Sequence, residues 1–188
     1  TNDDDGNEVT THRYQTFWSN FGTAMKEGMH LDPQYRDRIA PLLRYHSSAA
    51  TGLTSLQDYV DRMSEDQNNI YSVTATSLDA AQNSPHIERL RDNDLEVLYL
   101  TDPIDEWVVD ALPEFGNFKL VAASKGALDL PESEQDQSRM AEAKEEYGGL
   151  IDRVQELFKE QVKEVRLSSR LTDSPACLVT DEHSMSPQ

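Results

Sequence analysis

Three carboxylates stand together directly after the most strand-like run of the sequence. Asp102, Asp105 and Glu106 follow residues 95–100, and carboxylates at the C-terminal end of a parallel strand are where α/β enzymes often place metal ligands. One hypothesis is therefore a small magnesium-dependent phosphohydrolase. The alternative is structural. Asp102 would be an N-cap before Pro103, and the negative charges of Asp105 and Glu106 in the first turn would interact favourably with the helix dipole. The pattern favours this capping role.

Trp107, on the same predicted helix, is a candidate for binding another protein. The spacing predicts a helix over 103–112, with a buried face formed by Ile104, Val108 and Leu112 at four-residue steps. Trp107 lies at the margin of that face. It is either a core tryptophan or a partly exposed aromatic anchor, because tryptophans are enriched among the residues that dominate binding interfaces.

Other residue types that carry chemistry are scattered. Cys177 is the single cysteine, which excludes an intramolecular disulfide and a four-cysteine zinc site. Neither a GxGxxG nor a GK[ST] phosphate-binding motif occurs. The five histidines include no HxxxH pair; they are His12, His30, His46, His86 and His183. We expect no catalytic residue, no metal site and no cofactor in this segment.

The charge balance limits the choice of partners. The chain has 17 Lys and Arg against 35 Asp and Glu, a formal net charge of −18, and such a surface repels nucleic acid and anionic membranes. No apolar run approaches the length of a membrane span and no secretory leader is visible. We therefore expect no nucleic acid or membrane partner and a cytoplasmic location. Because the sequence begins with Thr1 and not with Met, we expect a piece cut from a longer protein; a processed terminus would give the same pattern.

The first third of the sequence predicts helices. After an acidic lead-in at 1–12, residues 13–66 are expected to form a three-helix coil. Gly28 should end the first helix, a second helix spans about 34–45 with Pro41 inside it, and a capping box at 55–58 opens the third. The first helix carries an apolar stripe, formed by Tyr14, Phe17, Trp18, Phe21 and Met25. Of these, Trp18, Phe21 and Met25 are expected to form the core of the coil, with a binding groove as the alternative.

Strands and helices then alternate, which predicts an α/β fold. Residues 67–130 are expected to form a small α/β sandwich with a short parallel sheet. Its strands are predicted at 70–75, 95–100 and 118–123, and its helices at 78–93, interrupted near Pro85, and 103–112. An acidic linker at 131–145 follows. A helix and two strands, at 162–167 and 176–180, then open a further α+β domain over 146–188.

Six sequence motifs, in the same order, resemble motifs of the heat-shock-protein-90 chaperones. The tryptophan that follows Asp105-Glu106 resembles the residue found there in the bacterial HtpG branch of the family. The motifs are FWxxFGxxxKEG around 18–27, DYVxRM with the following Ile-Tyr at 58–71, SPH at 84–86, EVLYLTDPIDEW at 96–107, the EF…KL motif at 114–120, and the V…RL…SPAC motif at 162–177.

The resemblance implies a place within a larger chaperone. Residues from about 14 to 130 correspond to the later part of the family's middle domain, and those from about 140 begin its C-terminal dimerisation domain. The full-length parent would be an ATP-driven homodimer that uses magnesium. Its ATP-binding domain, its nucleotide-contacting arginine loop and its terminal dimerisation helices have no counterpart here, so this segment itself is expected to be no enzyme.

The resemblance also implies partners and a site. The family binds unfolded or partly folded client proteins and co-chaperones. In its bacterial branch, a Glu-Trp pair on the helix corresponding to 103–112, with an Asn three residues later, lies at a client-binding edge. These positions correspond to Glu106, Trp107 and Asp110, where Asp replaces the family's Asn.

Overall fold

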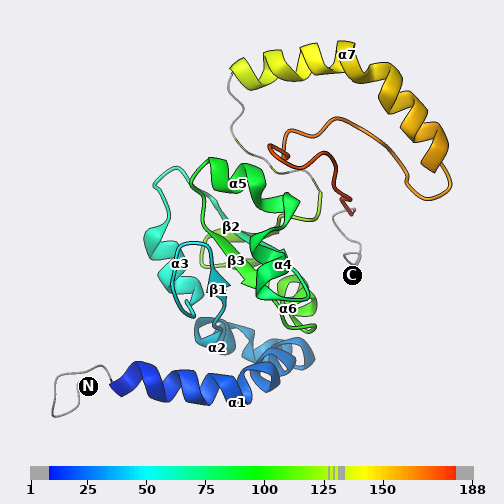
Figure 1. Cartoon of the computed structure of the whole chain (residues 1–188). Helices are drawn as coiled ribbons and strands as arrows, with labels where there is room; N and C mark the ends of the chain where they lie inside the picture. The colour runs from blue at the N-terminus through cyan, green and yellow to red at the C-terminus, as the bar shows by residue number, and fades with distance from the viewer. Residues whose placement is uncertain (1–8, 127, 129, 131–133, 181–188) are drawn as a thin grey trace.

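A five-stranded sheet forms the centre of the computed structural model, which describes residues 9–126, 128, 130 and 134–180 (Figure 1). The strand order is β1-β3-β2-β5-β4. β2 pairs in parallel with β3 and β5, whereas β1 and β4 add antiparallel edges. The bounds are β1 His46–Ser47, β2 Asn69–Thr74, β3 Val97–Leu100, β4 Glu114–Phe115 and β5 Phe118–Ala122. The predicted α/β class and its short parallel sheet are confirmed. The two-residue edge strands, too short for a period-2 pattern, were not predicted.

The sheet separates two apolar cores. Because side chains alternate along a strand, Ile70 of β2 and Leu98 of β3 face one core while Tyr71 and Val97 face the other. α4 (Leu78–Gln82) and α5 (Glu88–Asp92) cover the second core, with a 3-10 turn at Pro85–Ile87 between them. This break lies where Pro85 predicted one. α1 (Val9–Leu31), α3 (Leu56–Arg62) and α6 (Asp105–Ala111) supply residues to the first core.

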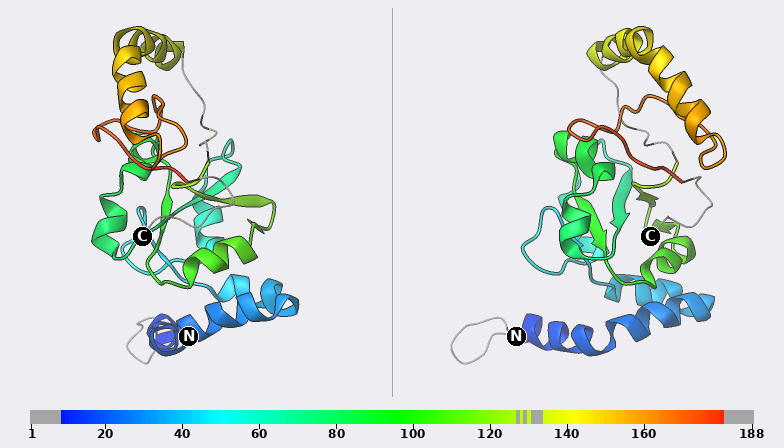
Figure 2. Two further views of the ribbon diagram at one scale, coloured as in Figure 1. Left: turned by 90° about the vertical axis from the view of Figure 1, so that its right-hand side faces the viewer. Right: turned by 45° about the vertical axis from the view of Figure 1, so that its right-hand side comes forward.

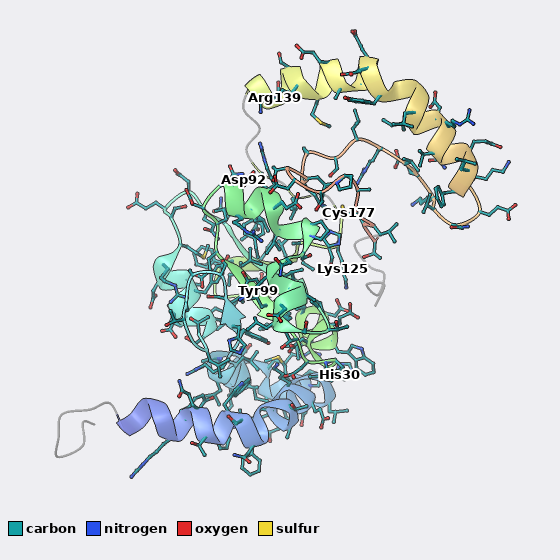
Figure 3. The ribbon with its side chains drawn as sticks, viewed as in Figure 1. His30, Asp92, Tyr99, Lys125, Arg139 and Cys177 are labelled. Atoms are coloured by element: carbon teal, nitrogen blue, oxygen red, sulfur yellow. The ribbon has the colours of Figure 1, made fainter. Side chains whose placement is uncertain are left out.

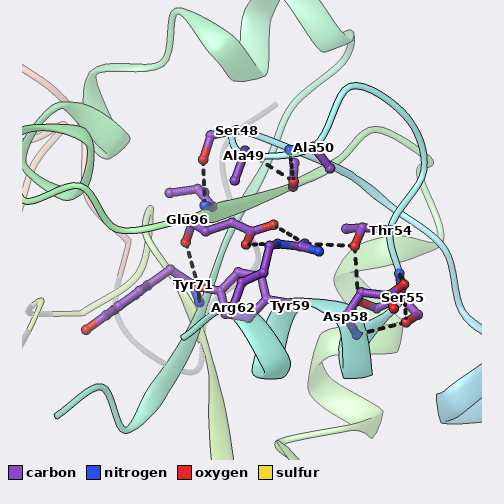
Figure 4. A network of polar contacts seen from close by, with 12 residues as sticks. Ser48, Ala49, Ala50, Thr54, Ser55, Asp58, Tyr59, Arg62, Tyr71 and Glu96 are labelled. Carbon is purple, nitrogen blue, oxygen red and sulfur yellow. Dashed lines mark hydrogen bonds and ion pairs between the residues drawn. The ribbon is translucent and has the colours of Figure 1, made fainter. Parts of the chain in front are cut away.

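Polar contacts bind α3 to the starts of β2 and β3 (Figure 4). The predicted capping box is present: the Asp58 amide donates to the Ser55 hydroxyl at 3.0 Å, and the Asp58 carboxylate accepts from the Ser55 amide at 3.1 Å. The hydrogen bond from the Ser55 hydroxyl lowers the pKa of Asp58. One turn on, the Tyr59 hydroxyl donates to the Glu96 carbonyl and accepts from the Tyr71 amide. Tyr59 is fully buried, so these bonds set the position of the helix.

The N-terminal coil differs from its prediction in two helices. α1 continues through Gly28 to Leu31, because the fully buried Met29 packs the last turn and outweighs the roughly 1 kcal/mol cost of a helical glycine. The predicted helix at 34–45 is three short pieces, namely 3-10 turns at Pro33–Tyr35 and Ala40–Leu42 with α2 (Arg36–Ile39) between them. Pro41 lies at the start of the second turn, where it needs no amide hydrogen bond.

The apolar stripe on α1 is only partly in the core. Trp18 is buried, but Phe17 and Phe21 are 42% and 55% exposed, so the expectation that Phe21 packs inside was wrong. The ring of Trp18 lies across Gly22: a Cβ there would lie 2.8 Å from the Trp18 ring. Gly22 therefore defines the buried side of α1, and Phe17 and Phe21 stack on each other beside it with ring centroids 5.3 Å apart.

After the sandwich the chain forms α7 (Glu134–Phe158) and then returns. α7 projects away from the sandwich at the end opposite α1 (Figure 2). The strands predicted at 162–167 and 176–180 do not form; within the described residues, Thr180 makes a single bridge with Lys125. An apolar run becomes a strand only where another strand edge pairs with it. Residues 1–8 and 131–133 of the predicted lead-in and linker lie outside the description. The remainder of each is helical, because α1 begins at Val9 and α7 at Glu134. No helix in the described part is long and apolar enough to span a membrane.

Candidate functional site

The segment that precedes α6 is folded differently from its prediction. α6 begins at Asp105, and its N-cap residue Ile104 makes no capping side-chain bond. The expected roles are reversed: the Asp102 amide donates to the Asp105 carboxylate at 3.0 Å. Asp102 is therefore not a side-chain N-cap. Its own carboxylate turns towards α1 instead.

Lys26 of α1 binds both aspartates. Its ammonium lies 2.5 Å from Asp102 Oδ2 and 2.7 Å from Asp105 Oδ1. The side chains of Lys26 and Asp105 are 4% and 1% exposed, whereas that of Asp102 is 43% exposed. The Tyr45 ring lies 4.9 Å from the ammonium. Burial raises the pKa of Asp105, and Lys26 opposes that shift. A buried lysine thus joins α1 to the start of α6.

This arrangement does not support a magnesium-dependent hydrolase. Two of the three carboxylates in that hypothesis, Asp102 and Asp105, are already paired with the Lys26 ammonium group, and Asp105 is closed to solvent. The part of the chain that the structure describes contains no group of three or more His, Cys, Asp or Glu side chains arranged to hold a metal ion.

Trp107 takes the exposed one of its two predicted positions. Val108 and Leu112 are buried as expected, but Trp107 is 44% exposed. Its ring packs against His30 with centroids 4.7 Å apart and planes at 57°. His30 lies near the end of α1, beside α6 (Figure 3). The tryptophan is therefore supported on one side by α1 and open to solvent on the other.

An open pocket of about 350 Å³ lies beside Trp107. Its lining comprises His30, Arg36, Glu106, Trp107, Asp110 and Ala111. The structure thus brings the three predicted site residues together on α6. Glu106 lines the pocket but is only 6% exposed. Asp110 is open to solvent and lies 3.5 Å from the Lys125 ammonium.

Sequence reasoning missed the opposite wall of this pocket. His30 and Arg36 come from α1 and α2, about seventy residues before α6, and neither belongs to a motif with Trp107. Arg36 is positioned by a bond from its Nε to the Met29 carbonyl at 3.3 Å. The site therefore combines an aromatic ring with acidic groups on one wall and basic or titratable groups on the other. Such a surface suits a polypeptide with both apolar and charged side chains.

Comparison with known proteins gives one consistent result. The family model described as "Hsp90 protein" matches residues 2–188. The chain is 48% identical over 176 residues to the chaperone protein HtpG of Aromatoleum aromaticum, which covers 91% of this chain and 27% of that protein. It is 46% identical over 184 residues to the HtpG of Geobacter sulfurreducens, covering 95% and 28% respectively. The chain thus spans little more than a quarter of the length of these relatives.

Proposed function

Since this chain belongs to the heat-shock-protein-90 family, we propose that it is a client-binding segment of an ATP-driven, dimeric chaperone and that Trp107 anchors the client. The observation that carries this proposal is the position of Trp107, 44% exposed beside an open pocket. Large aromatic side chains supply much of the binding energy at protein interfaces, above all where they border a pocket.

The chemistry around Trp107 suggests which clients bind. Glu106 and Asp110 lie on the pocket's α6 side, and the chain as a whole carries a formal charge of −18. Basic, partly unfolded polypeptides with exposed apolar residues are therefore favoured by long-range attraction and by contact with the ring. A single anchor and a small pocket give weak, rapidly exchanging contacts, as a chaperone that must release its client requires.

ATP chemistry belongs elsewhere in the parent protein under this proposal. The clustered carboxylates Asp102 and Asp105 hold Lys26 and do not fit a magnesium–nucleotide site. We therefore assign no catalytic step to this segment. The parent would bind ATP and magnesium through another domain, form a homodimer, meet co-chaperones and work in the cytoplasm.

A fluorescence-anisotropy titration tests the proposal. A labelled, partly unfolded basic protein is titrated with the chain, with Trp107→Arg, and with Phe21→Arg as the matched control. Phe21 is also an exposed aromatic, but it is not among the residues that line the pocket. We expect Trp107→Arg to weaken binding by about tenfold or more, as for a hot-spot residue, with the Tm unchanged. Phe21→Arg should bind the client as tightly as the unsubstituted chain does.

Three outcomes would contradict this assignment. Equal weakening by both variants would indicate a general effect of added positive charge. A fall in Tm with Trp107→Arg that matches the binding loss would give Trp107 a structural role. Absence of binding by the unmodified chain would mean that client contacts require other parts of the parent.

A further inference from the structure

The chain after α7 returns to the place from which it left. It leaves the sandwich after Gly126 and comes back through residues 170–180, where the Thr180 carbonyl accepts from the Gly126 amide at 3.0 Å. Both ends of this excursion therefore meet at one edge of the sandwich. In Figures 1 and 2 the returning segment passes beside α5, while α7 stands clear of the sandwich.

Glu88, the first residue of α5, holds the returning segment from one side. Its carboxylate accepts hydrogen bonds from three successive amides, those of Thr172 at 2.8 Å, Asp173 at 3.0 Å and Ser174 at 3.2 Å. It also accepts from the Ser174 hydroxyl. The Ser174 hydroxyl and the three amides hold the pKa of Glu88 at about 2. The carboxylate is therefore ionised at physiological pH, and its bonds belong to the strong, charge-assisted class.

Arg170 holds the segment at a second point. Its guanidinium is buried and donates to the Ala123 carbonyl at 2.5 Å and the Gly126 carbonyl at 2.6 Å. The Arg170 carbonyl in turn accepts from the Arg89 amide at 3.2 Å. One residue of the returning chain thus bonds to both the end of β5 and the start of α5.

Apolar burial contributes little to this docking. Leu178 is 64% exposed and Val179 is 37% exposed, so these side chains of the returning segment face solvent. Cys177, labelled in Figure 3, is only partly buried. A segment held by a few polar contacts detaches locally without opening a hydrophobic core, because local opening costs least where little apolar surface is buried.

We propose that Glu88, Arg170 and the backbone bonds of Thr180 with Ser124 and Gly126 form a polar latch that docks residues 170–180 reversibly on the sandwich. With the latch closed, α7 is tethered to the sandwich at both ends. With the latch open, α7 and everything that follows it are connected through the chain before α7 alone. The latch therefore controls the freedom of the C-terminal part of the segment relative to the sandwich and its Trp107 surface.

Hydrogen exchange of the whole chain tests the latch. The test variants are Glu88→Gln and Arg170→Lys, and the matched control is Asp92→Asn, which removes the same charge from an exposed position on α5. We expect amides 172–174 to exchange at least about tenfold faster in both test variants, because Glu88→Gln weakens their own hydrogen bonds and Arg170→Lys weakens a second anchor of the same segment. Exchange in β2 and β3 should not change. Unchanged exchange at 172–174 in Glu88→Gln, or equal acceleration in β2 and β3, would overturn the proposal.

A distance measurement tests the consequence for α7. Spin labels are placed at two exposed positions, Asp79→Cys on α4 and Glu145→Cys on α7, in a Cys177→Ser background. The distance distribution should be narrow with the latch intact and broad with Glu88→Gln. The same narrow distribution in both would show that the latch does not govern α7.

Discussion

Replacing Lys26 by Met should destabilise the protein strongly and in a pH-dependent way. Methionine keeps most of the length of the lysine side chain, so packing against Trp18 and Tyr45 is largely preserved. What disappears is the positive charge 2.7 Å from Asp105, a carboxylate that is 1% exposed. The substitution therefore isolates the electrostatic part of the α1–α6 contact.

The magnitude follows from the surroundings of the two aspartates. Removing one partner of a buried ion pair costs about 3–5 kcal/mol, because the remaining charge is neither paired nor hydrated. Asp105 retains one bond from the Asp102 amide, and Asp102 is 43% exposed and can be hydrated. We therefore expect a loss of about 3 kcal/mol at neutral pH, near the lower end of that range.

The pH dependence has a definite sign. Burial already raises the pKa of Asp105, and Lys26 is the largest influence that lowers it. Without Lys26 the folded protein holds a proton on Asp105 up to a higher pH than the unfolded chain does, because aspartates in an unfolded chain titrate at about 4. The folded state then binds more protons than the unfolded state in that window, so the variant loses stability as pH rises. The loss in free energy of unfolding, relative to the unsubstituted chain, should be largest at pH 7.5 and smaller at pH 5.

Urea unfolding followed by circular dichroism at both pH values measures these differences. The matched control is Lys26→Met with Asp105→Asn, which removes the buried charge and keeps an acceptor for the Asp102 amide. The free energy of unfolding of this double variant should lie within about 1 kcal/mol of that of the unsubstituted chain, because replacing a buried ion pair by uncharged side chains often changes stability little. This account of Lys26, Asp102 and Asp105 would be refuted if the single variant were within about 1 kcal/mol of the unsubstituted chain in free energy of unfolding, or if the double variant were no more stable than the single one.

Two further predictions concern the cores and the helices. Tyr59→Phe should cost about 1–3 kcal/mol in urea unfolding, because the buried Tyr71 amide loses its acceptor; a loss below about 0.5 kcal/mol would mean that the strand amide finds another partner. Gly22→Ala should destabilise by about 1–3 kcal/mol despite the better helix propensity of alanine, because its Cβ would lie 2.8 Å from the Trp18 ring. Gly149→Ala on α7, where a Cβ meets nothing within 4 Å, should instead favour the helix. Circular dichroism and urea unfolding of both variants check this: helicity should rise in Gly149→Ala, and stability should fall in Gly22→Ala.

The parallel sheet, α3 and α6 could be predicted because their signals are local. The runs at 70–75 and 95–100 are short and rich in β-branched, aromatic and aliphatic residues, as buried strands require, and Ser55 and Asp58 lie at capping-box spacing. α1 was wrong at its end and in its exposed aromatics for the opposite reason. Whether Gly28 stops a helix, and which side of α1 is buried, depends on Met29 and on the ring of Trp18, which contact distant segments.

The α/β class was predicted from the alternation of strand and helix patterns over residues 67–130, and the family from six motifs in series. The three site residues on α6 came from the resemblance and stay a prediction. Only the tertiary structure placed Lys26 between Asp102 and Asp105, set His30 and Arg36 opposite Trp107, and returned residues 170–180 to Glu88. These contacts join groups about seventy or more residues apart. The first two form because burial of a shared core brings α1, α2 and α6 together, and hydrophobic burial specifies no partner in the sequence. The third rests on polar contacts of Glu88 and Arg170, which no local pattern of the sequence reveals.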